Sequence, residues 1–194
     1  RKMAALKAKA LCPGHGIVVV GKDRVEQMLL DTAELLESIH EGALSLMNQG
    51  ATLDAVIQSV QVPEHLKKKP YLQPVYDEPQ YIARNIWRLY GGWYDGNPAH
   101  VKPAPESQQA SEIAKLAGGV AALVKRAKAL AKEGDLRLAC HLIEWAPAAA
   151  PGNRSVSKAR AEIYEGRAKV ETALMTMNIY HAAARESRAA LENE

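Results

Sequence analysis

The sequence predicts a mostly α-helical fold, and three observations point to it. The 194 residues include no Phe and many Ala, so small side chains would let neighbouring elements approach closely. Apolar residues recur at three- and four-residue steps over long stretches, as they do on the buried face of a helix. Only residues 17–20 form a β-branched run, the composition that favours strands. We therefore expect packed helices rather than a β-sandwich.

Composition excludes several classes of protein. With 47% hydrophobic and 24% charged residues the chain is ordinary globular material, not a disordered one. A net charge of +3 is too weak to indicate nucleic-acid binding. The unbroken apolar runs are only a few residues long, so no membrane span is predicted.

The two cysteines, Cys12 and Cys140, form no CxxC pair and cannot make a disulfide scaffold. We expect them to be free, buried thiols in a reducing compartment, which favours a cytoplasmic location. The mature chain of an exported protein stays open as an alternative, because the sequence begins abruptly.

The N-terminal part is expected to differ from the rest of the chain. Residues 1–10 are predicted as a short helix, residues 11–16 as a turn-rich loop, and residues 17–21 as a short strand or extended segment. Asp23 is then expected to cap a long helix that reaches about residue 49, just before Gly50.

The middle of the chain combines short helices with a proline-containing connector. Thr52 is expected to cap a helix over residues 53–60. Residues 67–79 are predicted as the connector, and the run Lys67–Lys69 within it as a solvated face, with an anion site as the alternative. Another helix should follow Pro79 and end at a glycine pair.

The last third is predicted to be helical again. Helices are expected over residues 111–116, 120–132, 136–145, 155–173 and 175–191, with a loop over residues 146–153. The turn at Gly134-Asp135 between two Ala-rich helices resembles one tetratricopeptide-type hairpin. The sequence does not show the three consecutive repeats that a solenoid needs, so we interpret this part as a local helical hairpin within a bundle.

His15 is the best candidate for a chemical role. It lies between Gly14 and Gly16, and both glycines allow the backbone to take positive φ and to expose the imidazole at a loop tip. Imidazole is the commonest zinc ligand, although a turn histidine without a role is an open alternative. One ligand cannot hold zinc by itself, because a site needs three or four.

The remaining histidines show neither HxH nor HExxH spacing, and we interpret them as surface or capping residues. They are His40, His65, His100, His141 and His181.

An aromatic segment is the second candidate site. Tyr90, Trp93 and Tyr94 lie beside Asp95 and Asn97 in a glycine-hinged stretch that is suited to lining an apolar pocket. The residues by themselves favour the other interpretation, that these aromatics are core anchors, because large side chains are scarce in a chain without Phe.

Two motifs resemble a known family of proteins. Leu11-Cys12-Pro13-Gly14-His15-Gly16 before a Val run resembles the last metal-ligand motif of the metallo-β-lactamase fold. Tyr-Gly-Gly-Trp-Tyr-Asp-Gly-Asn-Pro-Ala at residues 90–99 resembles the aromatic segment of the alkyl sulfatase dimerisation domain. Supporting matches are Asp31-Thr32, Met47-Asn48-Gln49-Gly50 and Gly134-Asp135-Leu136-Arg137, so the resemblance runs from about Leu11 to the end.

The resemblance implies a zinc-dependent hydrolase of sulfate esters with a binuclear metal site. Most ligands in that family belong to an upstream catalytic domain with an HxHxDH motif, and His15 would be the last histidine ligand. The aromatic segment lies near the active-site mouth in the family. Tyr94, and after it Tyr90, Trp93 and Asn97, are therefore the substrate-pocket candidates.

The sequence also departs from the family. The best-known alkylsulfatases carry a second histidine and a Trp-Pro pair around the final ligand, where this chain has Pro13-Gly14-His15-Gly16. A different ester or an anhydride is thus an alternative to a sulfate ester as substrate.

Taken together, residues 1–21 are predicted to be the C-terminal edge, helix and strand, of a metallo-β-lactamase-like domain. Residues 22–194 are predicted to be a helical alkyl sulfatase dimerisation domain. The expected partners are a second copy, the upstream catalytic domain and a small-molecule ester. The chain lacks most metal ligands and is expected to be inactive alone. The alternative is a tetratricopeptide-like interaction module with no enzymatic parent.

Overall fold

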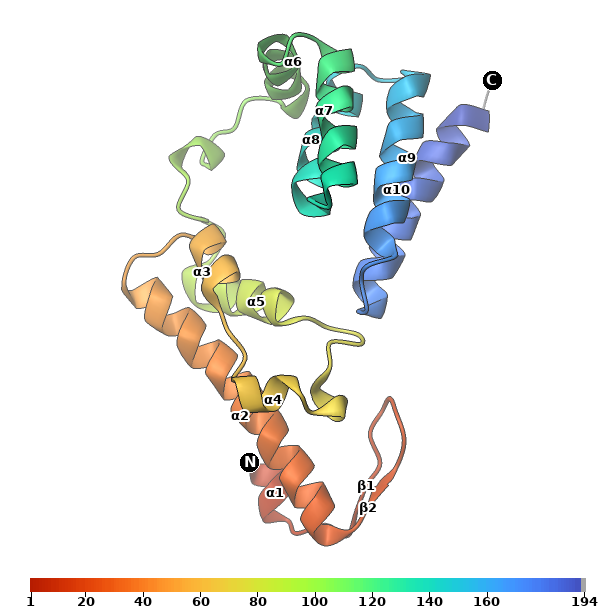
Figure 1. Cartoon of the computed structure of the whole chain (residues 1–194). Coiled ribbons are helices and arrows are strands. Elements are labelled where there is room, and N and C mark those ends of the chain that lie inside the picture. The colour runs from red at the N-terminus through yellow and green to blue at the C-terminus, as the bar shows by residue number, and fades with distance from the viewer. Residues whose placement is uncertain (193–194) are drawn as a thin grey trace. The chain divides into compact units, whose positions relative to one another are not determined.

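The structure is a computed structural model and describes residues 1–192 (Figure 1). Within these residues the fold is mostly α, with ten α-helices and one small two-stranded hairpin, as the sequence predicts for its class. The chain divides into two compact units, residues 1–98 and the part from Ala99 onward, and each unit has its own hydrophobic core.

The first unit is organised along one long helix. Its elements are α1 (Lys2–Ala5), β1 (Ala10–Leu11), β2 (Val19–Val20), α2 (Lys22–Asn48), α3 (Leu53–Ser59), α4 (Glu64–Lys67), the 3₁₀ helix η1 (Pro70–Leu72) and α5 (Pro79–Gly91). The hairpin of β1 and β2 lies at the N-terminal end of α2, whereas α3 and α5 lie toward its other end (Figure 1).

The hairpin confirms one predicted strand and adds one that was missed. Strand β2 lies inside the predicted extended segment, and it pairs antiparallel with β1, with Ala10 opposite Val20. The predicted helix over residues 1–10 is wrong beyond Ala5, because Lys7 adopts a positive φ of 53° and turns the chain toward β1. A single residue in this left-handed region is enough to stop a helix.

Helix α2 follows the predicted range, but its predicted cap is wrong. Gly21, with φ 113°, occupies the N-cap position, and Asp23 lies in the first turn instead. A carboxylate there faces the unpaired N–H groups of the helix start, which is a favourable place for negative charge.

The core of the first unit forms where α2, α3 and α5 meet. Ile39 and Ala43 of α2 are fully buried there, as are Val56 of α3 and Ala83 of α5. Trp87 is the large aromatic of this core and is only 9% exposed. The predicted N-cap of α3, Thr52, is confirmed.

The lysine run of the connector is not uniformly solvated. The Lys67 ammonium pairs with Glu64 at 2.5 Å, and the Lys69 ammonium lies 3.2 Å from a carboxylate oxygen of the buried Asp31. The interpretation as a solvated face is therefore wrong for Lys69, because a carboxylate on α2 draws this side chain inward.

The second unit is built from helices packed on their sequence neighbours. Its elements are α6 (Glu106–Leu116), α7 (Val120–Glu133), α8 (Leu136–Ala149), α9 (Arg154–Ala168) and α10 (Leu174–Glu192), preceded by the 3₁₀ helix η2 (Pro98–His100). The buried residues between these helices are Leu123, Ala127, Leu130, Ala139, Ile143, Ala146, Val156, Ala159, Ile163, Tyr164 and Ala184. The prevalence of Ala lets the helix axes approach closely.

The turn between α7 and α8 has the chemistry that the sequence predicts. Gly134, with φ 90°, ends α7 in the left-handed region, and the Asp135 side chain accepts a hydrogen bond from the Leu138 N–H at 3.2 Å. The predicted loop over residues 146–153 starts too early, because α8 continues through Pro147 to Ala149. Proline in a last turn removes a single helix hydrogen bond, and the buried Ile143 and Ala146 hold the turn in place.

The expectation that both thiols are buried is wrong for Cys12. Cys12 is exposed because it lies in the hairpin loop directly after β1, whereas Cys140 is half-buried on α8. Burial disfavours the thiolate and raises the pKa of Cys140 to about 11. Among residues 1–192, no helix is both long and apolar enough to cross a membrane.

Arg160 joins three helices of the second unit. From α9 its guanidinium donates to a Glu144 carboxylate oxygen of α8 at 2.8 Å and to both the Ala183 carbonyl and the Ser187 hydroxyl of α10, each at 2.8 Å. The same group lies 5.1 Å from the centre of the Tyr164 ring. One cation thus satisfies acceptors on both neighbouring helices.

We predict that Arg160→Met lowers the free energy of unfolding by about 1–3 kcal/mol, because it leaves these acceptors without their donor. Urea denaturation followed by circular dichroism measures the loss. Arg188→Met is the matched control: Arg188 pairs with Glu165 at 2.5 Å but is 57% exposed, so its loss should stay below about 1 kcal/mol. Equal losses in the two variants would contradict the prediction.

Candidate functional site

A cavity of about 760 Å³ lies beside the hairpin in the first unit. Its walls come from the hairpin, the first turns of α2 and the connector, and most of the wall surface is apolar. The lining residues are Pro13, His15, Gly16, Ile17, Val19, Arg24, Gln27, Met28, Pro70, Tyr71, Gln73 and Val75. His15 is the one sequence-predicted site residue in this set.

His15 lies in the hairpin loop and is exposed, as the sequence predicts. Of its two flanking glycines only Gly16 uses this freedom, with a positive φ of 100°. The imidazole stacks on the ring of Tyr76, with ring centres 6.1 Å apart and planes inclined by 15°. The loop therefore holds the imidazole at the cavity in a defined orientation.

The first unit does not form a metal centre from its own side chains. In the part of the chain that the structure describes, no three His, Cys, Asp or Glu side chains lie close enough together to hold a metal ion. His15 offers one imidazole where zinc requires three or four ligands. The described side chains therefore do not form a metal site by themselves, and His15 stays a predicted ligand.

The aromatic segment lies on the surface. Tyr90, Trp93 and Tyr94 are 56%, 76% and 39% exposed, so the interpretation of these three as core anchors is wrong. The buried Trp87 fills the core position instead. The Tyr90 hydroxyl lies 3.1 Å from the His40 Nε2 of α2.

Hydrogen bonds fix the backbone of this segment. The Trp87 indole N–H donates to the Tyr94 carbonyl at 3.0 Å, and the Leu53 N–H donates to the Asp95 carbonyl at 2.9 Å. Gly96 has φ +95°, and a Cβ added there would lie 2.8 Å from the Thr52 methyl carbon. The segment is therefore pressed against the start of α3, and glycine is required at residue 96.

Asn97 takes part in the same turn, since its backbone N–H donates to a carboxylate oxygen of Asp95 at 2.9 Å. The four pocket candidates and His15 are not brought together at one cavity, because none of Tyr90, Trp93, Tyr94 and Asn97 lines the cavity beside His15. The roles of all five residues stay predictions.

The cavity and the aromatic segment contact different parts of α2. Gln27 of α2 lines the cavity, whereas His40 contacts Tyr90. At 1.5 Å per residue these two positions are roughly 20 Å apart along the helix.

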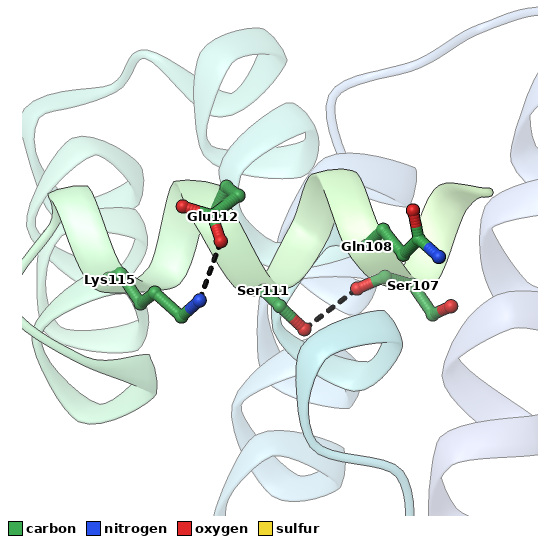
Figure 2. Close-up of a pocket in the computed structure, with 5 residues that line it drawn as sticks. All are labelled: Ser107, Gln108, Ser111, Glu112 and Lys115. Atoms are coloured by element: carbon green, nitrogen blue, oxygen red, sulfur yellow. Dashed lines mark hydrogen bonds and ion pairs between the residues drawn. The ribbon is translucent and has the colours of Figure 1, made fainter. Parts of the chain in front are cut away.

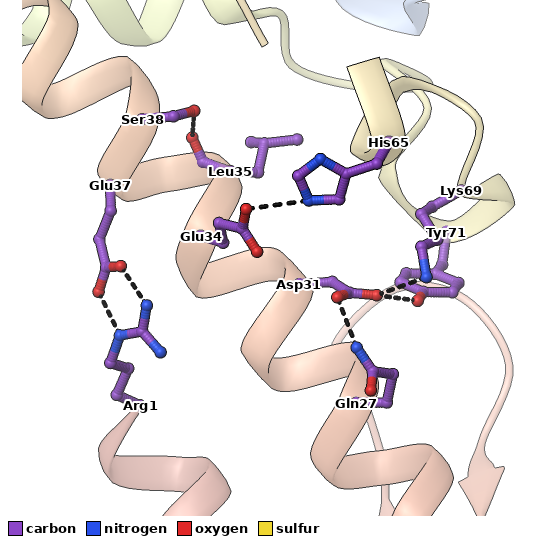
Figure 3. Close-up of polar contacts among 10 residues, drawn as sticks. All are labelled: Arg1, Gln27, Asp31, Glu34, Leu35, Glu37, Ser38, His65, Lys69 and Tyr71. Atoms are coloured by element: carbon purple, nitrogen blue, oxygen red, sulfur yellow. Dashed lines mark hydrogen bonds and ion pairs between the residues drawn. The ribbon is translucent and has the colours of Figure 1, made fainter. Parts of the chain in front are cut away.

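Sequence reasoning missed the role of Asp31, a buried carboxylate on α2 that is only 5% exposed. Its carboxylate accepts hydrogen bonds from the Gln27 amide at 2.7 Å and from the Tyr71 hydroxyl, and it pairs with Lys69 (Figure 3). An acidic residue within the apolar repeat of a helix is the signal that could have found it, although two of its three donors, Lys69 and Tyr71, lie about forty positions later in the chain.

The surroundings of Asp31 shift three pKa values. The Tyr71 hydroxyl, and then Gln27 and Lys69, lower the pKa of Asp31, and these effects outweigh the opposing effect of burial. The Asp31 carboxylate raises the pKa of Lys69. Burial, and then Asp31, raise the pKa of Tyr71. At neutral pH Lys69 is therefore protonated, Asp31 is ionised and the Tyr71 phenol is neutral.

Two further ion pairs attach short segments to α2 (Figure 3). Arg1 and Glu37 form a two-point pair at 2.5 and 2.7 Å, which holds the chain start on the helix. The His65 Nε2 lies 2.9 Å from a Glu34 carboxylate oxygen, which holds α4. Both carboxylates are partly exposed, unlike that of Asp31.

A second concave surface lies along α6 in the other unit. Figure 2 shows its polar side chains on one face of this helix. The Ser111 hydroxyl donates to the Ser107 carbonyl at 2.8 Å, and Lys115 pairs with Glu112 at 2.5 Å. These groups are bonded to their own helix, so they do not define a binding site.

Fold and cavity together define a class: a mostly helical domain with a short hairpin that presents one histidine. The family profile described as alkyl sulfatase dimerisation matches residues 52–190, more than half of the chain. The chain belongs to this family, which confirms the resemblance seen in the sequence.

Three curated relatives are alkylsulfatases. A linear primary-alkylsulfatase from a Pseudomonas species is 32% identical over 146 residues, covering 75% of this chain and 28% of the relative. An (R)-specific secondary-alkylsulfatase from Pseudomonas is 30% identical over 183 residues, which cover 94% of this chain and 28% of the relative. The alkyl/aryl-sulfatase BDS1 of Saccharomyces cerevisiae is 25% identical over 182 residues, with the same coverage of 94% and 28%.

A solved structure supports the same relationship. The stereoselective inverting sec-alkylsulfatase Pisa1 from Pseudomonas matches with a TM-score of 0.88 and 29% identity, covering 94% of this chain and 29% of that one. The chain therefore spans less than a third of the length of these relatives.

We predict that Asp31→Asn destabilises the chain by about 1–3 kcal/mol at pH 7 through loss of charged hydrogen bonds. A carboxylate whose pKa is lowered on folding stabilises the fold above its unfolded pKa, and this stabilisation is lost as the pH falls through the folded value. The difference in free energy of unfolding between wild type and variant should thus become smaller below about pH 4. Urea denaturation between pH 7 and pH 3 measures it, and a gap independent of pH would contradict the prediction.

Proposed function

We propose that this chain is the dimerisation portion of a metallo-β-lactamase-fold hydrolase that resembles the alkylsulfatases and cleaves sulfate esters. The observation that carries the proposal is that alkylsulfatases align with 94% of the chain and share its fold at a TM-score of 0.88. Another ester or an anhydride stays the alternative substrate, because the motif around His15 differs from that of the best-known family members.

In this proposal residues 1–21 are the C-terminal edge of the catalytic domain. The exposed fractions in the hairpin support this assignment: Ile17 is 85% exposed, Val18 56% and Val20 65%. A two-stranded hairpin is at best marginally stable alone, and unpaired strand edges readily pair with a further strand. A sheet of the upstream domain would cover these apolar side chains and complete the hydrogen bonding of the strands.

His15 would contribute one neutral imidazole to a zinc ion of a binuclear site, and the upstream domain would supply the other ligands. When bound, zinc lowers the pKa of a water molecule and neutralises charge on the leaving group. The residues of this chain would orient the ligand. The Tyr76 ring holds the His15 imidazole, and the apolar walls beside it limit access of water.

The remaining parts of the proposal are a homodimer and a substrate contact. Exposed apolar residues on the helices, such as Leu89 at 75% and Leu116 at 88%, support a covered surface in an assembly. The exposed aromatic segment supports contact with an apolar small molecule through Tyr94, and after it Tyr90, Trp93 and Asn97.

The rival is a tetratricopeptide-like interaction module. The capped turn between α7 and α8 is its strongest support. The similarity to alkylsulfatases extends over both units of the chain, whereas a hairpin motif covers only a part of one unit. We therefore prefer the hydrolase.

We predict that the 194-residue chain takes up zinc no better than unrelated proteins, because it offers one ligand. In the longer protein that contains this chain, His15→Ala should lower both the zinc content and the turnover of a sulfate ester. Metal analysis by mass spectrometry and an ester-hydrolysis assay measure the two effects. His65→Ala, which removes an exposed histidine that does not line the cavity beside His15, is the control and should leave the metal content unchanged.

Tight, stoichiometric zinc binding by the 194-residue chain would contradict this assignment of the ligands. So would an unchanged metal content in the His15→Ala variant.

We predict that the chain sediments as a dimer at micromolar concentration, at twice its mass of 21.1 kDa. The physical reason is the exposed apolar helical surface, which a second copy would cover. Sedimentation velocity at increasing concentrations measures the mass, and a clean monomer would contradict the homodimer.

A further inference from the structure

We propose that Asp31 is a positioning residue for His15, acting through the connector that forms one wall of the cavity. This inference rests on the proposed function, because it concerns the residue proposed as a metal ligand. Asp31 does not line the cavity itself, but the side chains that it binds do. Figure 3 shows it between α2 and the connector.

The first step is the direct contact of Asp31 with two wall residues. Its carboxylate accepts from the Gln27 amide on its own helix and from the Tyr71 hydroxyl of the connector, and both side chains line the cavity. The buried Asp31 carboxylate thus sets the positions of two polar side chains, Gln27 and Tyr71, that line the cavity together with His15.

The second step carries the constraint along the connector. Lys69 pairs with Asp31, and the Gln73 amide donates to the Lys69 carbonyl at 3.0 Å and to the Lys67 carbonyl at 2.6 Å. These bonds close residues 67–73 into a compact turn around η1. The turn leads directly to Tyr76, whose ring stacks on His15.

The chemistry at position 31 favours a positioning role over simple packing. A buried carboxylate is costly unless donors satisfy it, and here an amide, a phenol and an ammonium converge on it. An apolar residue at position 31 would pack against the connector without specifying where Lys69 and Tyr71 lie. The carboxylate selects one placement of the connector, and a metal ligand depends on such outer contacts for its orientation.

The test uses the 194-residue chain and needs neither metal nor catalysis. Asp31→Asn keeps the size of the side chain and removes its charge, whereas Tyr71→Phe removes only the hydroxyl donor. The matched control is Glu37→Gln, which breaks the Arg1 pair on the same helix away from the cavity. Nuclear Overhauser contacts between the rings of His15 and Tyr76 are measured, with those between Ile39 and Trp87 as a reference for the intact core.

The expected result is loss of the His15–Tyr76 contacts in Asp31→Asn and their weakening in Tyr71→Phe, with the Ile39–Trp87 contacts retained. Glu37→Gln should leave both sets unchanged. Retained His15–Tyr76 contacts in Asp31→Asn, or an equal loss in Glu37→Gln, would overturn the proposal. If Asp31→Asn fails to fold, Tyr71→Phe decides, because a half-exposed tyrosine tolerates loss of its hydroxyl.

A second measurement separates this inference from the proposed function. In the longer protein, Asp31→Asn should lower metal affinity or turnover on the order of 10–100-fold, as loss of outer-shell contacts does. If His15→Ala lowers the metal content while Asp31→Asn leaves the His15–Tyr76 contacts intact, the positioning role fails and the function stands. If Asp31→Asn frees His15 while His15→Ala leaves the metal content unchanged, the function fails and the positioning role stands.

Discussion

The buried carboxylate of Asp31 must be paired with hydrogen-bond donors, and the part of the first unit around the cavity depends on this requirement. Asp31 lies on a helix whose apolar face packs into a core, so its charge must find donors within the protein. Two of the three donors, from Lys69 and Tyr71, belong to a connector with little regular structure of its own. The connector therefore takes its place from α2, and the cavity takes its wall from the connector.

In the second unit a partly buried cation, Arg160, has a comparable role. Ala residues bring α8, α9 and α10 close together, which leaves little room for large polar side chains between them. Arg160 occupies that space because its planar guanidinium donates in several directions at once and stacks on Tyr164. In both units a few enclosed charges therefore specify how segments meet, while small and apolar residues supply most of the buried area.

The sequence predicted the helices well because their signals are local. Periodic apolar residues, the Thr52 cap and the Gly134-Asp135 turn are each contained within a few residues. Strand β1 was missed because Ala10–Leu11 has no strand-forming composition, and its pairing with β2 is made across a loop. The contacts of Asp31 were missed for the same reason, since two of its three donors, Lys69 and Tyr71, are distant in sequence.

Burial of the aromatics shows the limit of composition as a guide. A chain without Phe was expected to bury its large rings, yet Trp87 lies in the core while Trp93, six residues later, is 76% exposed. The loop backbone explains the choice: Gly96 must lie against Thr52, and the Asp95 carbonyl must accept from the start of α3. With the backbone fixed in this way, the neighbouring Trp93 and Tyr94 rings lie at the surface. The two proposed roles thus start from different local constraints: hydrogen bonds fix the turn that carries the exposed aromatics, whereas stacking on Tyr76 orients the His15 imidazole.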